Sequence, residues 1–258
     1  MALLKRLNAA LRSHCSLNRN REFSLLLRCA GEGPRGALLD IGSGDGFWTD
    51  RFAQHFEASF GLEPDPRALR LARKLHGARV RYIHGFAENL CFENQTFDCV
   101  VSVSCFEHFR NARSAFEESF RVLKPGGRIA VSVDSLLPEN STERFRKWHR
   151  RQYVVNEYFS ERRLTELLSG AGFVVDPRHT RHLITSPLSA RIRELYLRNT
   201  RPLLPLFPLL YPLVLLADRF SRQRPGQILV MSARKPGPAE KDLEPEFQQA
   251  LDAAFSPA

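Results

Sequence analysis

Apolar residues between positions 37 and 133 come in short runs, separated by longer segments in which they recur every three or four residues. The short runs are typical of buried strands and the longer segments of amphipathic helices. Strands that alternate with helices in this way predict an α/β fold, with a doubly wound, mainly parallel sheet and helices on both faces. We expect strands at 37–41, 59–63, 80–83, 97–104 and 128–133, and helices at 46–56, 66–76 and 111–123.

The alternation changes after residue 133. Residues 134–159 are polar and aromatic, and we expect them to form a cap over an edge of the sheet. A helical pattern returns at 160–171, and apolar runs at 173–175 and 227–231 predict the last two strands. We therefore divide the chain into an N-terminal helical segment (1–36), a core (37–180) that includes the cap, an insertion (181–225), a last core strand (226–235) and an acidic tail (236–258).

The first residues are expected to form an amphipathic helix, with one face made by Leu3, Leu4, Leu7 and Leu11. Lys5 and Arg6 fall inside this apolar run, which argues against a secretory signal. Residues 1–21 lack acidic side chains, so a mitochondrial transit peptide stays an open alternative for a eukaryotic protein.

The composition narrows the class of protein. Of the 258 residues, 43% are hydrophobic and 26% charged, which is enough apolar material for a large core. The five cysteines include no Cys-x-x-Cys pair, and their odd number argues against a disulfide framework and a structural zinc site. A reducing compartment fits this pattern, so we expect a cytoplasmic protein, peripheral on the membrane if the insertion binds lipid.

Three glycines follow the first predicted strand directly, in the sequence Asp40-Ile-Gly-Ser-Gly-Asp-Gly46, and a helical segment comes next. Glycines at this place let the backbone turn sharply and let a ligand approach the positive end of the helix. Glu63 ends the next strand, 21 residues after Gly42, where a carboxylate can accept two hydrogen bonds from a ribose diol. The combination predicts a nucleotide site rather than an ordinary tight turn.

A dinucleotide fingerprint has a third glycine three residues after the second, and here that position holds Phe47. With its G-x-G-x-G spacing, the chain instead resembles the class I S-adenosylmethionine-dependent methyltransferases, particularly the broad small-molecule group that includes quinone-biosynthesis C-methyltransferases. The resemblance implies a seven-stranded, Rossmann-like sheet, S-adenosyl-L-methionine as the cofactor and methyl transfer as the reaction. Besides the glycine turn, it rests on motifs at residues 61–65, 85–92, 97–108 and 121–128.

Carried over position by position, the resemblance also implies which residues hold the cofactor. This chain departs from the family at Phe86, where an Asp commonly accepts a hydrogen bond from the adenine amino group. Either Glu88 replaces that contact, or stacking and backbone contacts hold the base. The methionine part and the ribose would lie against Asp40, Gly42, Ser43, Gly44, Gly46 and Glu63. The adenine and the reactive end would lie against Pro64, Asp65, Ala87, Glu88 and Ser104.

Methyl transfer is an in-line displacement, so the protein mainly has to align the acceptor and exclude water. An oxygen or phenol-activated carbon would also benefit from a general base. His108 is our candidate, because it follows the fourth strand and histidine is a common general base in enzymes; the alternative is that Glu107 and His108 cap the next helix. His149, in the cap, is a second candidate. Metal-dependent catechol enzymes need clustered acids after the fourth and fifth strands, where only Asp134 qualifies, so we expect no metal.

The net charge of +10 is concentrated between residues 178 and 224, where nine arginines face only Glu194 and Asp218. They flank the apolar run 203–217, which contains three prolines and is shorter than the roughly 20 residues that span a bilayer. Such a segment suits an anionic membrane surface or a lipid-like acceptor. A core cover or a subunit interface with a basic rim is an equally supported interpretation.

The leading hypothesis is therefore metal-independent methyl transfer from S-adenosyl-L-methionine to a small-molecule or lipid-like acceptor at a membrane surface. One alternative is an RNA methyltransferase, suggested by the basic charge, although stacking aromatics are scarce between residues 178 and 224. The other is an inert methyltransferase-like binding protein, which the departure at Phe86 would allow. We expect a small molecule, a lipid or an anionic membrane surface as the partner, rather than nucleic acid.

Overall fold

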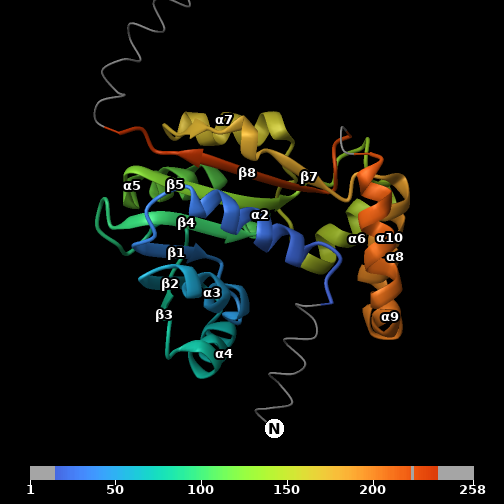
Figure 1. Ribbon diagram of the computed structural model, residues 1–258, viewed down its shortest axis with the longest axis horizontal. Coiled ribbons are helices and arrows are strands. Elements are labelled where there is room, and N and C mark those ends of the chain that lie inside the picture. Colours follow the sequence, from blue (N-terminus) through green and yellow to red (C-terminus); the bar gives the residue numbers. More distant parts are fainter. Residues whose placement is uncertain (1–14, 222–223, 238–258) are drawn as a thin grey trace, which may run out of the picture.

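The computed structural model describes residues 15–221 and 224–237 (Figure 1). A sheet forms the middle layer, and helices lie on both of its sides. The apolar face expected at Leu3, Leu4, Leu7 and Leu11 lies outside the described residues, and so does the acidic tail from residue 238 onward.

The central sheet has the order β3-β2-β1-β4-β5-β8-β6, with β7 paired to β8. Strands β1 to β5 are parallel, and β8 runs antiparallel to β5, β6 and β7. The doubly wound, mainly parallel α/β fold is thereby confirmed. The bounds are β1 (Ala37–Ile41), β2 (Ala58–Glu63), β3 (Arg81–His84), β4 (Phe97–Val103), β5 (Leu123–Asp134), β6 (Val174–Val175), β7 (Arg181–Leu183) and β8 (Ile228–Arg234).

Helices cover both faces of this sheet (Figure 1). On one face, α5 and α7 pack with Leu39 of β1; on the other, α2, α8 and α10 pack with Leu38. Successive strand residues thus serve opposite faces, as strand geometry requires. The helices are α2 (Arg19–Gly31), α3 (Phe47–Phe52), α4 (Pro66–His76), α5 (Ala112–Val122), α6 (Glu143–Tyr153), α7 (Glu161–Gly170), α8 (Pro187–Arg198), α9 (Thr200–Leu203) and α10 (Phe207–Arg219). Short 3-10 turns are η1 (Ala53–His55), η2 (Phe106–His108), η3 (Pro177–His179) and η4 (Leu204–Leu206).

Strand β5 is longer than the expected 128–133. The register between β4 and β5 shifts between Phe97 and Cys99, and Gly126 adopts a φ of +79°. Such a bulge keeps residues 124–127 in the strand instead of leaving them as a loop.

The insertion differs from the separate segment that the sequence predicts. Its first three residues form β7, which adds an eighth strand to the described sheet. Ile192, Tyr196 and Val214 of its helices are buried in the same cluster as Leu26 of α2. The inner side of the insertion therefore belongs to the core. None of the helices in the described part of the chain is long and apolar enough to cross a bilayer.

The carboxyl ends of β1 and β4 point towards the side on which α6, α8 and α10 lie (Figure 1). The first turn of α2 reaches the same edge, because Glu22 accepts a hydrogen bond from Ser104, which directly follows β4. Ligands of open α/β sheets bind outside the carboxyl ends of the strands. This edge is therefore where the candidate residues are expected to meet.

Candidate active site

Each glycine of the turn after β1 has its own surroundings. Gly42, Gly44 and Gly46 have φ angles of +80°, +55° and +84°, which favour glycine over other residues. A Cβ at Gly42 would lie 2.1 Å from the sulfur of Cys105, and one at Gly46 would lie 2.4 Å from the Tyr82 hydroxyl oxygen. At Gly44 a Cβ would meet nothing within 4 Å. The turn is thus packed on both sides and open in the middle.

Glu63 is fixed against the open part of this turn. Its Oε2 accepts a hydrogen bond from the Gly44 amide at 2.8 Å, and its Oε1 accepts one from the Asp65 amide at 2.9 Å. Each carboxylate oxygen has two acceptor positions, so each keeps one for a ligand. The pairing predicted between the glycine turn and the acid at the end of β2 is present.

Two buried polar atoms beside the turn have no partner in the structure. The Oδ2 of Asp40 accepts from the Thr49 hydroxyl at 2.6 Å, whereas its Oδ1 is unpaired; the buried hydroxyl of Ser43 is unpaired too. Burial raises the pKa of Asp40 to about 7, and the nearby charge of Glu63 adds to this effect. Because buried polar groups in proteins normally have partners, these atoms indicate a place where a polar ligand would bind.

The residues expected around an adenine differ in how far they are exposed to solvent. Pro64 is exposed, while the Asp65 side chain accepts from the Arg67 amide at 2.9 Å and caps α4. Ala87 is buried in the core, and Glu88 is half-buried. Phe86, at the position where the family has an Asp, is 59% exposed. The Phe86 ring therefore borders solvent and could pack against a ligand.

Ser104 and Glu22 form a buried polar contact that sequence reasoning misses. Ser104 has a φ of +44°, and its hydroxyl donates to the Oε2 of Glu22 at 2.8 Å. Ser132 donates to the same oxygen at 2.6 Å, Arg19 approaches it at 3.2 Å, and Asn18 donates to the other oxygen. The sequence does contain one indication that Glu22 is buried. Glu22 lies one helical turn before Leu26 and two turns before Cys29, which places it on the apolar face of α2.

His108, the candidate base, lies half-buried in η2. Its Nδ1 is 3.3 Å from the Val154 carbonyl oxygen, and its own carbonyl accepts from the Asn156 amide group at 2.6 Å. A carbonyl oxygen only accepts, so Nδ1 carries the proton and Nε2 keeps the basic lone pair. Helix α5 is capped by Asn111, which accepts from the Ser114 amide, so the alternative role for His108 as that helix's cap is wrong.

Four titratable groups meet at the carboxyl ends of β4 and β5. Asp134 Oδ1 pairs with the Arg193 guanidinium at 2.7 Å, its Oδ2 lies 3.5 Å from the Nε2 of His149, and its amide donates to the Oε1 of Glu107 at 3.2 Å. Burial opposes the charged form of Asp134, yet Arg193 and His149 hold its pKa below its usual value. Burial and the Asp134 charge raise the pKa of Glu107 well above its ordinary range. Both effects favour the protonated, uncharged form of Glu107.

His149, the second candidate base, is buried on α6. Its Nδ1 lies 3.1 Å from the Tyr158 hydroxyl, and its ring packs 4.6 Å from that of Tyr153. Burial lowers the pKa of His149 to about 4, against the opposing effect of Asp134, so the imidazole is neutral at pH 7.

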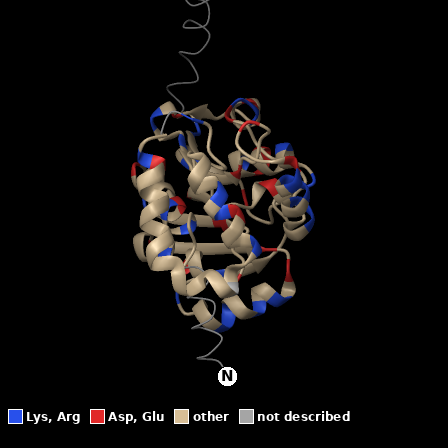
Figure 2. Cartoon of the chain, turned by 90° about the vertical axis from the view of Figure 1, so that its right-hand side faces the viewer, with Lys and Arg blue, Asp and Glu red and all other residues tan. Residues whose placement is uncertain are grey.

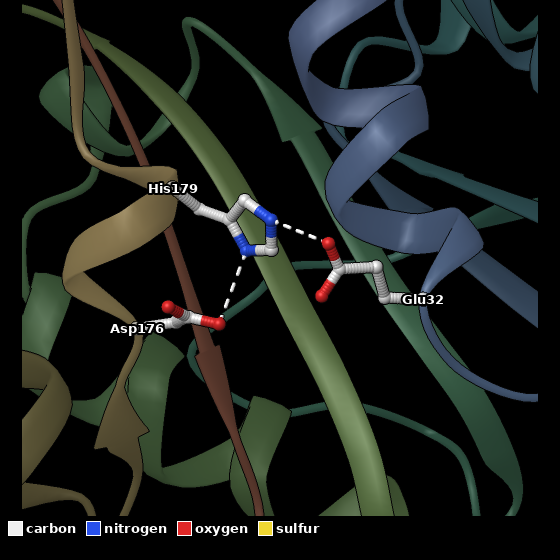
Figure 3. Close-up of side chains that lie close together, drawn as sticks. All are labelled: Glu32, Asp176 and His179. Atoms are coloured by element: carbon white, nitrogen blue, oxygen red, sulfur yellow. Dashed lines mark hydrogen bonds and ion pairs between the residues drawn. The ribbon is translucent and has the colours of Figure 1, made fainter.

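Glu32, Asp176 and His179 offer ligand atoms within 4.8 Å of one another (Figure 3). His179 contacts Glu32 at 2.8 Å and Asp176 at 3.3 Å. Two arginines already neutralise the acids: Arg178 pairs with Asp176 at 2.8 Å, and Arg128 lies 3.6 Å from Glu32. Hydrogen bonding to Arg178 lowers the pKa of Asp176 to about 2. We interpret the cluster as an ion-pair network that joins the end of α2 to the sheet, rather than as a metal site.

Comparison with known proteins agrees with this geometry. Residues 39–131 match the model of a family described as methyltransferase domain. A probable S-adenosylmethionine-dependent methyltransferase from Mycolicibacterium smegmatis is 32% identical over 152 residues, 58% of this chain and 54% of that protein. The ubiquinone/menaquinone biosynthesis C-methyltransferase UbiE from Vibrio cholerae is 33% identical over 111 residues, 40% of this chain and 43% of that protein.

A solved structure, the YcgJ protein of Bacillus subtilis, has the same fold, with a TM-score of 0.62 at 18% identity over 84% of this chain and 99% of that one. The chain spans about half the length of the two relatives above. The family match spans β2, β3, β4 and most of β1 and β5, and it includes the glycine turn. Residues 39–131 of the chain therefore form a methyltransferase domain of the class I S-adenosylmethionine-dependent type.

Proposed function

We propose that this protein transfers a methyl group from S-adenosyl-L-methionine to a lipid-like small molecule at an anionic membrane surface, without a metal ion. The observation that carries the proposal is the open glycine turn, on which Glu63 is held by two backbone amides beside the unpaired atoms of Asp40 and Ser43. When bound, the cofactor supplies a methyl group on a positively charged sulfur.

The residues beside the turn suit the parts of this cofactor. The free acceptor positions of Glu63 would take the two ribose hydroxyls, and the open space at Gly44 would admit the chain close to the backbone. The unpaired Oδ1 of Asp40 and hydroxyl of Ser43 would bind the polar methionine end. Gly42 and Gly46 keep the turn in shape.

Adenine would lie on the far side of Glu63, among Pro64, Asp65, Ala87 and Glu88. Because Phe86 has no hydrogen-bonding group and is largely exposed, we assign it a stacking role instead of the amino-group contact of the family's Asp. The end of β4 would then lie at the methyl group, with Ser104 held by Glu22 and the Nε2 of His108 available as a base.

Support for a lipid-like acceptor comes from the outer side of α10. Leu206, Leu209, Leu213, Leu216 and Phe220 are spaced three or four residues apart, and all are exposed, Leu209 by 72% and Phe220 by 81%. We call these five residues the apolar stripe. Charged residues of α10 occur only at its carboxyl end. Figure 2 views the molecule from the right-hand side of Figure 1, where α10 lies, and most of this helix has the tan colour of uncharged residues. A contiguous exposed apolar surface of this kind marks a binding surface.

Arginines line a groove that α10 also borders, on a side of this helix from which the apolar stripe is absent. A groove of about 1100 Å³ between α2, β7 and α10 is lined by Arg21, Arg28, Arg181 and Arg219, of which the last three are exposed. Arg21 pairs with the buried Asp218 at 2.6 Å. A helix that carries exposed apolar side chains and borders a groove with exposed cations suits an anionic lipid surface, where each cation contributes about 1 kcal/mol. Arg193, also among the nine arginines of this region, is buried and is not part of this surface.

We expect the protein to sediment with anionic vesicles, more weakly with neutral ones, and to be released only in part by salt, because apolar burial is not screened. Changing Leu209, Leu213 and Leu216 together to Ser should abolish the salt-resistant part. Phe207 and Leu210 stay unchanged, since they are half-buried against the core. Val174→Ser, at an exposed valine on β6, is the matched control. Equal sedimentation of the triple variant and the wild type would contradict a membrane role for α10.

Transfer of tritium from methyl-labelled S-adenosylmethionine tests the reaction itself. We expect label to enter the organic phase when the protein is incubated with extracted membrane lipids, and not when the lipids are omitted. Label found only in added RNA would support the RNA methyltransferase instead. Absence of transfer to any fraction, with the cofactor bound, would support an inert binding protein.

A further inference from the structure

A cavity of about 610 Å³ lies among the residues before α2, the end of α6, and α8 with the start of α9. Cavities that bind small molecules in proteins are commonly of this size. Among the described residues that line it, none is assigned to the cofactor and none is His108. The cavity is therefore a place for a second ligand, apart from S-adenosyl-L-methionine and from the candidate base.

Two arginines of α8 line this cavity, and both have buried nitrogens without a hydrogen-bond acceptor. The terminal nitrogens of Arg193 donate to Asp134 at 2.7 Å and to the Gln227 side chain at 3.1 Å, but its Nε has no partner. In Arg198, both Nε and Nη2 lack an acceptor. Because a buried guanidinium donor without an acceptor is costly, these three nitrogens indicate oxygen atoms of a ligand.

The two nitrogens of Arg198 lie on the same edge of its guanidinium group. Two parallel N–H donors on one edge match the two oxygens of a carboxylate. The guanidinium carbon lies 5.1 Å from the ring centre of Trp148 and 5.7 Å from that of Phe145, so cation–π contacts hold the group in place. Glu194 lies 3.2 Å from Nη2 as an ion pair but accepts no hydrogen bond from it. Arg198 is thus fixed in position with its paired donors unused.

The charges around the cavity favour a ligand with a single negative charge. Its described wall contains the two arginines and no acidic residue. Asp134 neutralises Arg193. Glu194, however, pairs with both Arg198 and Arg191, the latter at 3.4 Å, which leaves one positive charge over. A carboxylate supplies the missing charge, whereas a dianion would have to be buried with one charge unpaired.

We propose that this cavity binds an organic carboxylate, with Arg198 as the anchor for its two oxygens and the Nε of Arg193 as a further donor in the wall. The inference goes beyond the proposed methyl transfer and does not depend on it. The rest of the wall suits an apolar body, since Leu17 is buried there and Tyr153 and Tyr196 supply aromatic rings. The class of ligand is therefore a small aromatic or aliphatic acid.

The test compares the binding of 2-naphthoate, a fluorescent carboxylate, with that of 2-naphthamide, an uncharged analogue of nearly the same shape. We expect the carboxylate to bind about tenfold or more tightly than the amide, because its hydrogen bonds to a guanidinium are charge-assisted. Arg198→Gln should weaken 2-naphthoate binding by about ten- to a hundredfold and leave 2-naphthamide binding nearly unchanged. Arg198→Lys keeps the charge but loses the paired donors, and should still weaken 2-naphthoate binding about tenfold.

Arg191→Gln is the matched control, because Arg191 is an exposed arginine of the same helix that pairs with the same Glu194 but does not line the cavity. It should leave the affinity for 2-naphthoate unchanged. Leu197→Trp should fill the cavity and abolish 2-naphthoate binding, while Leu195→Trp, at an exposed leucine outside the cavity, should not. Thermal unfolding followed by circular dichroism establishes which variants are folded. If Arg198→Gln does not fold, Arg198→Lys and Leu197→Trp test the site in its place.

Inorganic phosphate distinguishes a carboxylate site from a general anion site, and it should not displace 2-naphthoate. Displacement by phosphate, equal affinities for 2-naphthoate and 2-naphthamide, or equal losses for Arg191→Gln and Arg198→Gln would each contradict the inference. If the folded wild type does not bind 2-naphthoate, water fills the cavity and the inference is wrong. None of these results depends on binding of S-adenosylhomocysteine, which tests the proposed function separately.

Discussion

Replacing His108 by alanine should lower the rate of methyl transfer to lipid by roughly 10²–10⁴, the usual contribution of a general base. The physical reason is that Nδ1 is held at the Val154 carbonyl, which leaves Nε2 as a proton acceptor just after β4. Tritium transfer into the organic phase measures the rate. The affinity for S-adenosylhomocysteine should not change, because His108 is not among the residues assigned to the cofactor.

His55→Ala, at an exposed histidine in η1, is the matched control and should leave the rate unchanged. A fall of only a few-fold for His108→Ala would contradict its role as base. The contact with Val154 would then be structural, holding the end of α6 to η2. In that case the neutral His149 would become the remaining candidate among the described residues.

Glu63→Ala and Gly44→Val should each weaken S-adenosylhomocysteine binding by about ten- to a hundredfold. The first change removes charge-assisted hydrogen bonds to the ribose, which contribute on the order of 1.5–3 kcal/mol. The second places a branched side chain in the open space at the turn, at a φ of +55°. Isothermal titration calorimetry measures both effects.

Two controls separate lost contacts from general damage. Gly126→Val imposes the same backbone strain, at a φ of +79° and with nothing near its Cβ, but in the bulge of β5 away from the turn. Glu57→Ala removes an exposed carboxylate just before β2. Neither should change the affinity. Equal losses for Gly126→Val and Gly44→Val would mean that strain, not the ligand, explains the effect.

The elements that the sequence predicts well are those governed by local rules. The strand before the glycine turn, the turn itself and Glu63 all lie within residues 37–63, and turn geometry and strand length bring them together. The same holds for α4, whose start follows from Pro66 and the cap at Asp65. These parts of the cofactor site need no knowledge of distant contacts.

The remaining parts of the site depend on contacts between distant residues. Glu22 meets Ser104 across 82 positions, and Arg193 meets Asp134 across 59. In the sequence, Arg193 is one of nine arginines between residues 178 and 224, and nothing distinguishes it from the exposed ones. Burial is decided by which helix packs against which strand, and hydrophobic periodicity does not specify the partner.

The insertion shows a related ambiguity. Residues 203–217 are apolar on every side, so periodicity cannot assign one face of α10 to the core and the other to a surface. The structure buries Val214 and leaves the apolar stripe exposed. Strand β7 is missed for a similar reason, because three residues are too few to form a recognisable pattern.

Calorimetry on the unmodified protein with S-adenosylhomocysteine and with NAD⁺ tests the central claim most directly. The G-x-G-x-G turn with Glu63 at the end of β2 predicts one site for S-adenosylhomocysteine and no measurable binding of the dinucleotide. Binding of NAD⁺ in preference to S-adenosylhomocysteine, or no binding of S-adenosylhomocysteine, would contradict the assignment of the glycine turn as the cofactor site of a methyltransferase.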